Sequence, residues 1–102
     1  MKVQNMRSTR SNNDIPNQFI ITEEGRGALG NFRRRETFQS YTSIIATITY
    51  WNGEFRKVEV DEKYWNYSKT TSKYRSEFLG ETTKETEAKI KNGEYKLINL
   101  NS

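Results

Sequence analysis

Three consecutive arginines form the densest group of side chains that could hold an anionic partner. Arg33, Arg34 and Arg35 follow one another, Arg26 lies close before them, and no acidic residue interrupts the run. Guanidinium groups bind phosphate oxygens, and the phenylalanines that flank this run offer rings on which bases can stack. The same pattern fits a solvated strand whose alternate residues face water. The sequence leaves both interpretations open.

A second basic group lies in a segment rich in hydroxyl side chains. Lys69, Lys73 and Arg75 fall within residues 68–75, which carry four Ser or Thr residues. At the start of a helix, the free backbone N–H groups and the helix dipole attract anions, so these residues are candidates for a phosphate site. The alternative is that a Ser or Thr caps the helix and the lysines face solvent.

The residue types that most often carry catalysis are missing. The sequence contains no His and no Cys, which excludes Ser-His-Asp chemistry, thiolate nucleophiles and ordinary zinc sites. Glu81, Glu85 and Glu87 could form acid–base pairs, but the start of a helix explains their position as well. We therefore expect a protein that is not an enzyme and that uses no cofactor or metal.

Length and charge point to one small domain with an anionic partner. The chain has 102 residues, of which 32% are hydrophobic, and a net charge of +4. Seven basic and four acidic residues lie in positions 1–40, so most of the positive charge is in that part. The N-terminus has no apolar run typical of a secretory signal, and no segment is long enough to span a membrane. We expect a cytoplasmic protein with no membrane partner.

The elements that must position these residues follow a polar segment. Residues 1–16 are basic and have few apolar side chains, so we expect a flexible tail that ends at Pro16. Residues 17–102 then form a single domain. The motif G-x-G-x-x-G at residues 25–30 follows a strand candidate at residues 17–22, but strand-like residues come after it, so we expect a hairpin loop rather than a dinucleotide site.

The strongest strand candidate covers residues 43–50, and a hairpin follows it. A three-residue loop at residues 51–53 would set Ala46 opposite Val58 and Ile44 opposite Val60, which places apolar residues on one face. Thr47, Thr49 and Lys57 would then face outward. A last strand is expected at residues 94–99.

Two helices follow the hairpin. The first is expected at residues 70–79 and ends at Gly80, while Thr82 and Glu85 predict a capping box for the second, which Asn92 and Gly93 close. The fold class is therefore α+β, with an antiparallel sheet of three to five strands packed by two short helices. The nearby aromatic residues form part of the core or a platform for a partner; they are Tyr64, Trp65, Tyr67 and Tyr74.

Three blocks of sequence resemble a small protein family. Residues 38–46 (FQSYTSIIA), 64–74 (YWNYSKTTSKY) and 78–80 (FLG) are similar to uncharacterised proteins encoded by phages and mobile elements of Gram-positive bacteria. The resemblance covers roughly residues 17–100, and it carries over no catalytic residues. It implies an accessory gene of a phage, expressed inside a bacterial host.

Three functions fit these observations. The first is a non-enzymatic inhibitor of a host defence system, an anti-CRISPR protein that acts on an RNA-guided Cas nuclease or its guide RNA. Such a nuclease has basic channels that an acidic mimic of DNA would fill, whereas a basic chain is better suited to RNA or to an acidic protein face. The second is a general nucleic-acid-binding accessory protein in phage replication or regulation. The third is a structural or virion-linked protein.

Overall fold

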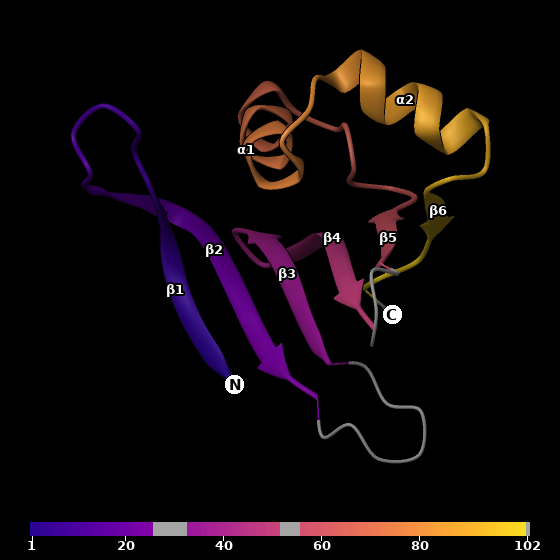
Figure 1. Ribbon diagram of the computed structural model, residues 1–102. Helices are drawn as coiled ribbons and strands as arrows, with labels where there is room; N and C mark the ends of the chain where they lie inside the picture. Colours follow the sequence, from indigo (N-terminus) through magenta and orange to yellow (C-terminus); the bar gives the residue numbers. More distant parts are fainter. Residues whose placement is uncertain (26–32, 52–55, 102) are drawn as a thin grey trace.

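The computed structural model describes residues 1–25, 33–51 and 56–101. Within these ranges the elements are β1 (Lys2–Arg7), β2 (Asp14–Glu24), β3 (Arg34–Ser40), β4 (Ser43–Tyr50), β5 (Arg56–Asp61), α1 (Lys69–Leu79), α2 (Thr83–Lys91) and β6 (Lys96–Ile98). The strands form one sheet in the order β1 to β6. Both helices lie on the same side of the sheet, and the turn of the β1–β2 hairpin lies beside α1 (Figure 1).

The expected antiparallel sheet of three to five strands is wrong in strand number and in strand direction. The described sheet has six strands and is mixed, because β6 pairs with β5 in parallel. Strand β6 returns to the sheet only after the chain has passed through both helices, and this longer connection permits the parallel direction.

The expected flexible tail is also wrong, because residues 1–16 contain β1 and the start of β2. Strand β1 is polar, yet an edge strand needs backbone pairing more than burial, and β2 supplies that pairing. The side-chain amide of Asn5 also donates a hydrogen bond of 3.0 Å to the carbonyl of Ile15. In the turn, Ser8 N–H donates to the carbonyl of Asn13 at 2.9 Å.

The pairing of β4 with β5 differs from the expected register by two residues. Ala46 lies opposite Val60 and Ile48 opposite Val58, while Tyr50 pairs with Arg56, so the connection is longer than three residues. A shift of two preserves the face shared by Ala46, Ile48, Val58 and Val60. The expectation for Ile44 is wrong: the β3–β4 pairing shifts between Phe38 and Gln39, and Ile44 is not part of this buried cluster. Residues 52–55 of this connection, like the glycine motif after Gly25, lie outside the described residues.

The core lies between the sheet and the helices. Its buried members are Ala46, Ile48, Val58, Val60, Leu79 and Tyr95, and Trp65 packs against them. Thr47 and Thr49, expected to face outward, are buried as well. The aromatic group is therefore divided: Trp65 joins the core, whereas Tyr67 is exposed.

The helix ends confirm the sequence signals. Ser68 caps α1 by accepting a hydrogen bond from Thr71 N–H, and Gly80 ends this helix with a left-handed φ of 71°. Thr82 and Glu85 form the expected capping box at the start of α2. Neither described helix is long and apolar enough to cross a membrane.

Candidate nucleic-acid interface

The residues that line two hollows come mainly from the β1–β2 hairpin and from α1, so a groove runs between these two elements. Figure 1 shows the elements as neighbours, with α1 on the side of the sheet that carries the helices. The two hollows have volumes of about 400 and 450 Å³ and share Glu77 as a lining residue. Met6, Ile20 and Phe78 supply the apolar part of the lining of the first hollow, and polar or charged residues supply the rest. The groove exists because α1 packs on β3 and β4, which leaves the helix-side face of β1 and β2 uncovered.

The second hollow brings together two cations from distant parts of the sequence. Arg10 in the hairpin turn and Lys73 on α1 both line it, together with Tyr74. The ammonium of Lys73 lies 5.2 Å from the centroid of the Tyr74 ring. Cations that hold phosphates beside a ring that stacks on a base are the combination used to bind single-stranded nucleic acid.

The hairpin turn is held in shape by its own polar groups, and these groups fix where Arg10 lies. The hydroxyl of Ser8 accepts a hydrogen bond from Arg10 N–H at 3.2 Å, and Asn12 adopts a left-handed φ of 57°. Arg7 lines the first hollow and forms an exposed ion pair of 3.8 Å with Asp14. The groove is therefore cationic at the hairpin turn and acidic further along, where Glu36 and Glu77 line it.

The arginine run at the start of β3 lies away from this groove and makes contacts within the sheet. The guanidinium of Arg34 lies 4.6 Å from the centroid of the Tyr50 ring, and Arg35 Nε donates a hydrogen bond of 3.1 Å to the hydroxyl of Thr49. Both arginines are half-buried and lie opposite glutamates of β2. Arg33 is exposed.

The residues around the start of α1 match the helix-capping interpretation. Lys69 is exposed beside a hollow of about 330 Å³, and Ser68 already satisfies the N–H of Thr71. The hydroxyl of Ser72 donates to the side-chain oxygen of Asn66 at 2.6 Å. The structure therefore separates Lys69 from Lys73, which lines the groove instead. Arg26 lies outside the described residues.

Arg75 is buried, although the sequence placed it among the partner-binding residues. Its side chain has no exposed surface, and its guanidinium donates to the carbonyl of Trp65 and, at 2.6 Å, to the hydroxyl of Thr83. It also lies 5.1 Å from the centroid of the Trp65 ring. Burial lowers its pKa, an effect that the negative charge of Glu81 partly offsets. Arg75 cannot reach a partner in this fold, so we assign it to the core.

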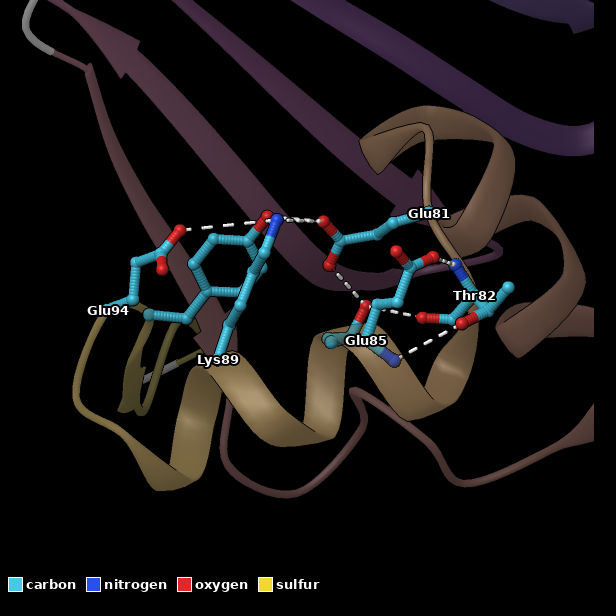
Figure 2. Close-up of polar contacts among 7 residues, drawn as sticks. Glu81, Thr82, Glu85, Lys89 and Glu94 are labelled. Atoms are coloured by element: carbon cyan, nitrogen blue, oxygen red, sulfur yellow. Dashed lines mark hydrogen bonds and ion pairs between the residues drawn. The ribbon is translucent and has the colours of Figure 1, made fainter.

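Glu81 is the centre of a polar cluster that the sequence did not reveal (Figure 2). One carboxylate oxygen accepts hydrogen bonds of 2.8 Å from the ammonium of Lys89 and from the hydroxyl of Tyr95, and the other accepts one of 2.6 Å from Thr86. Burial raises the pKa of Glu81, but the hydrogen bonds outweigh burial and lower it overall. The cluster joins the α1–α2 connection to α2 and to the residue before β6.

The role of this cluster is structural rather than catalytic or ligand-binding. Both oxygens of Glu81 already have partners, and only 5% of its side chain is exposed. The three donors follow Glu81 by 5, 8 and 14 residues, a spacing that matches no short sequence motif. Among the described residues, no group of three or more acidic, His or Cys side chains could hold a metal ion.

The chain folds as a small α+β protein in which helices cover one side of a mixed sheet and a groove lies between α1 and the β1–β2 hairpin. The chain belongs to a family of unknown function, DUF8033, whose model matches residues 1–94. The matched segment includes β1, so the hairpin is part of the family's unit. No curated protein and no solved structure matches the chain.

Proposed function

We propose that this protein is a non-enzymatic RNA-binding protein of a phage or mobile element. It acts in the bacterial cytoplasm, where it binds the RNA of a host defence ribonucleoprotein and inhibits an RNA-guided nuclease, as an anti-CRISPR protein does. The observation that carries the RNA-binding part is the meeting of Arg10, Lys73 and Tyr74 in one hollow. The phage context and the target rest on the sequence resemblance.

The groove favours a single strand over a duplex. Proteins read unpaired RNA by stacking bases on aromatic rings and by holding the backbone with cations, whereas duplex RNA is bound across its grooves by a broad surface. A hollow of about 450 Å³ with one aromatic residue fits the first mode. Glu77, which lines both hollows, repels phosphate and so favours a bound segment that lies near Arg10 and Lys73.

A binding assay with a matched control tests this proposal. Labelled eight-nucleotide single-stranded RNA is titrated against the wild type and against the double variant Arg10→Gln/Lys73→Gln at several salt concentrations. We expect the variant to bind at least tenfold more weakly. The slope of log affinity against log salt is negative, and its magnitude should decrease by about 1.4. The variant loses two phosphate contacts, and each contributes about 0.7 for a single strand.

The control removes the same charge from a remote surface. Lys84→Gln/Lys91→Gln changes exposed residues of α2 and should leave affinity and slope unchanged. The triple variant Arg33→Gln/Arg34→Gln/Arg35→Gln tests the arginine run separately. If the triple variant loses the salt slope and Arg10→Gln/Lys73→Gln keeps it, the interface is at β3 and the groove proposal is wrong.

A pull-down from host cytoplasm, with and without ribonuclease, tests the target. Recovery of a defence ribonucleoprotein that ribonuclease releases supports inhibition through RNA. Recovery of RNA or DNA alone supports the alternative of a general nucleic-acid-binding protein in phage replication or regulation. Recovery of virion proteins, insensitive to nuclease, supports a structural role and contradicts the proposal.

A further inference from the structure

The two edges of the sheet differ in what they offer another chain. The order of strands leaves β1 at one edge and β6 at the other. Strand β6 has three residues, whereas β1 has six. Alternate residues of an edge strand direct their backbone N–H and C=O groups outward, where a further strand can pair with them. The longer edge is therefore the one able to accept another strand.

We propose that β1 accepts an extended acidic segment of a partner protein as an additional strand of the sheet. The charge of this edge selects the partner, because β1 carries Lys2 and Arg7 and residues 1–13 contain no acidic side chain. Both basic residues are exposed. Strand addition uses the backbone for affinity and alternate side chains for specificity.

The two faces of β1 define the pattern that the partner strand must have. Gln4 lies opposite Ile20, and Ile20 lies opposite Phe38, whose ring contacts Phe78 of α1, so Gln4 is on the helix side. Lys2 is two residues before Gln4 and therefore points to the same face. Arg7 would point to the other face in a regular strand, but the pairing shifts between Asn5 and Arg7, and Arg7 lines the same hollow as Gln4. The basic side chains are thus at both ends of the helix side.

The opposite face of the edge is apolar at its start. Val3 lies opposite Ile21, away from the helices, and is 57% exposed, while Met1 is 92% exposed. A partner strand therefore fits best when carboxylates alternate with apolar residues. The carboxylates then face Lys2 and Arg7, and an apolar side chain covers Val3. The exposed ion pair between Arg7 and Asp14 is weak enough to exchange for this contact.

A second copy of the chain fits this edge poorly. An antiparallel register that pairs all six residues of β1 with those of another β1 sets Lys2 opposite Arg7 at both ends. Like charges directly opposite each other destabilise a strand pair. The edge thus resists self-pairing and remains open to an acidic strand.

The test uses a capped, labelled heptapeptide of alternating Glu and Val, titrated against the full chain. We expect saturable binding, with amide shifts confined to β1 and its neighbours. The variant Lys2→Glu/Arg7→Glu should bind this peptide at least tenfold more weakly and should bind the corresponding Lys–Val peptide instead. The control Lys63→Glu/Lys84→Glu, which reverses two exposed charges away from the edge, should change affinity less than twofold.

Backbone methylation of the probe separates strand addition from simple charge attraction. All Glu N–H groups of an extended peptide point to one edge and all Val N–H groups to the other. Of two probes, one methylated at every Glu nitrogen and one at every Val nitrogen, only one should bind, and it identifies the strand direction. Equal binding of both, binding of neither, or a dimer whose β1 amides are protected and which ignores the peptide would overturn the proposal.

Peptide binding can be tested separately from RNA binding. Arg10→Gln/Lys73→Gln leaves Lys2, Arg7 and the outer edge of β1 unchanged, so it should keep peptide binding while it loses RNA binding. Loss of both ligands together in that variant would mean that the edge and the groove are one surface, and would contradict a separate strand-addition site.

Discussion

At the scale of single residues, Arg75 shows how a charged side chain serves a small core. It lies on the buried face of α1 with Thr71 and Leu79. The helical spacing in the sequence favours a different buried face, made of Tyr67, Thr71, Tyr74 and Phe78. The helix is instead rotated so that Arg75 is buried. This burial is tolerated because the guanidinium donates hydrogen bonds to oxygens of the segment before α1 and of the start of α2. The planar guanidinium presents several donors in fixed directions and so joins these two segments better than a compact ammonium would.

Arg75→Lys separates a structural role from partner binding. The change keeps the positive charge but loses the paired donors, so buried oxygens of Trp65 and Thr83 lose partners. We expect the free energy of unfolding to fall by about 2 kcal/mol. Denaturant melts measure it, with the exposed Arg33→Lys as the control that should leave stability unchanged. A stable Arg75→Lys variant with impaired RNA binding would return Arg75 to the interface.

At the scale of elements, the β1–β2 hairpin is the part that the composition of the sequence conceals. Strand β1 buries little, because only Asn5 and Met6 are half-buried. It nevertheless covers the edge of β2 and supplies one wall of the groove. The same hairpin therefore links stability to both proposed interfaces.

Removing residues 1–13 tests the structural role of β1. The shortened chain exposes the backbone of β2 at a new edge, and we expect it to lose about 1–2 kcal/mol of stability, which lowers the Tm by roughly 4–16 °C for a domain of this size. Thermal melts of the shortened and full chains measure the difference. An unchanged Tm would show that the pairing of β1 with β2 does not contribute to stability.

At the scale of the whole molecule, two buried carboxylates join the helical layer and the C-terminal segment to the sheet. Asp61 accepts backbone hydrogen bonds from Lys63 and Tyr64, at 3.0 and 2.9 Å, and one of 2.8 Å from Leu100. Burial raises the pKa of Asp61, but these hydrogen bonds outweigh it, so the pKa is lowered. Glu81 performs the corresponding role between α2 and β6.

The pH dependence of stability follows from these shifts. The lowered pKa values of Asp61 and Glu81 stabilise the fold above the ordinary carboxyl range of about 4, and this contribution is lost as pH falls through the folded values. The hydrogen bond to Glu81 raises the pKa of Lys89, and burial raises that of Tyr95; these contributions are present below about pH 10 and are lost above it.

We therefore expect the Tm to be nearly constant from about pH 5 to 9 and to fall on both sides. Glu81→Gln should lower the Tm at neutral pH and make the acid decline shallower, because one of the linked carboxyls is gone. Thermal melts across pH measure this, and Glu87→Gln, an exposed partner of Lys91, is the control that should keep the wild-type profile. An unchanged acid limb in Glu81→Gln would show that Glu81 is not linked to folding.

The sequence by itself determined the local features of this protein. The two helices, the Gly80 stop and the capping box of Thr82 and Glu85 depend on neighbours within four residues, and the structure confirms them. The face shared by Ala46, Ile48, Val58 and Val60 also follows from the alternation of side chains along a strand. Such features need only the geometry of the backbone close by.

Only the tertiary structure decided which distant segments meet. The entry of β1 into the sheet, the parallel pairing of β6, the burial of Arg75 and the meeting of Arg10 with Lys73 all join residues that no local pattern relates. Pairing partners on β2 stabilise a strand too polar to bury itself, and hydrogen-bond acceptors from two segments stabilise a charge that the sequence places at the surface. These features arise from contacts between segments that are distant in sequence. The groove therefore follows from the tertiary structure and not from any local sequence pattern.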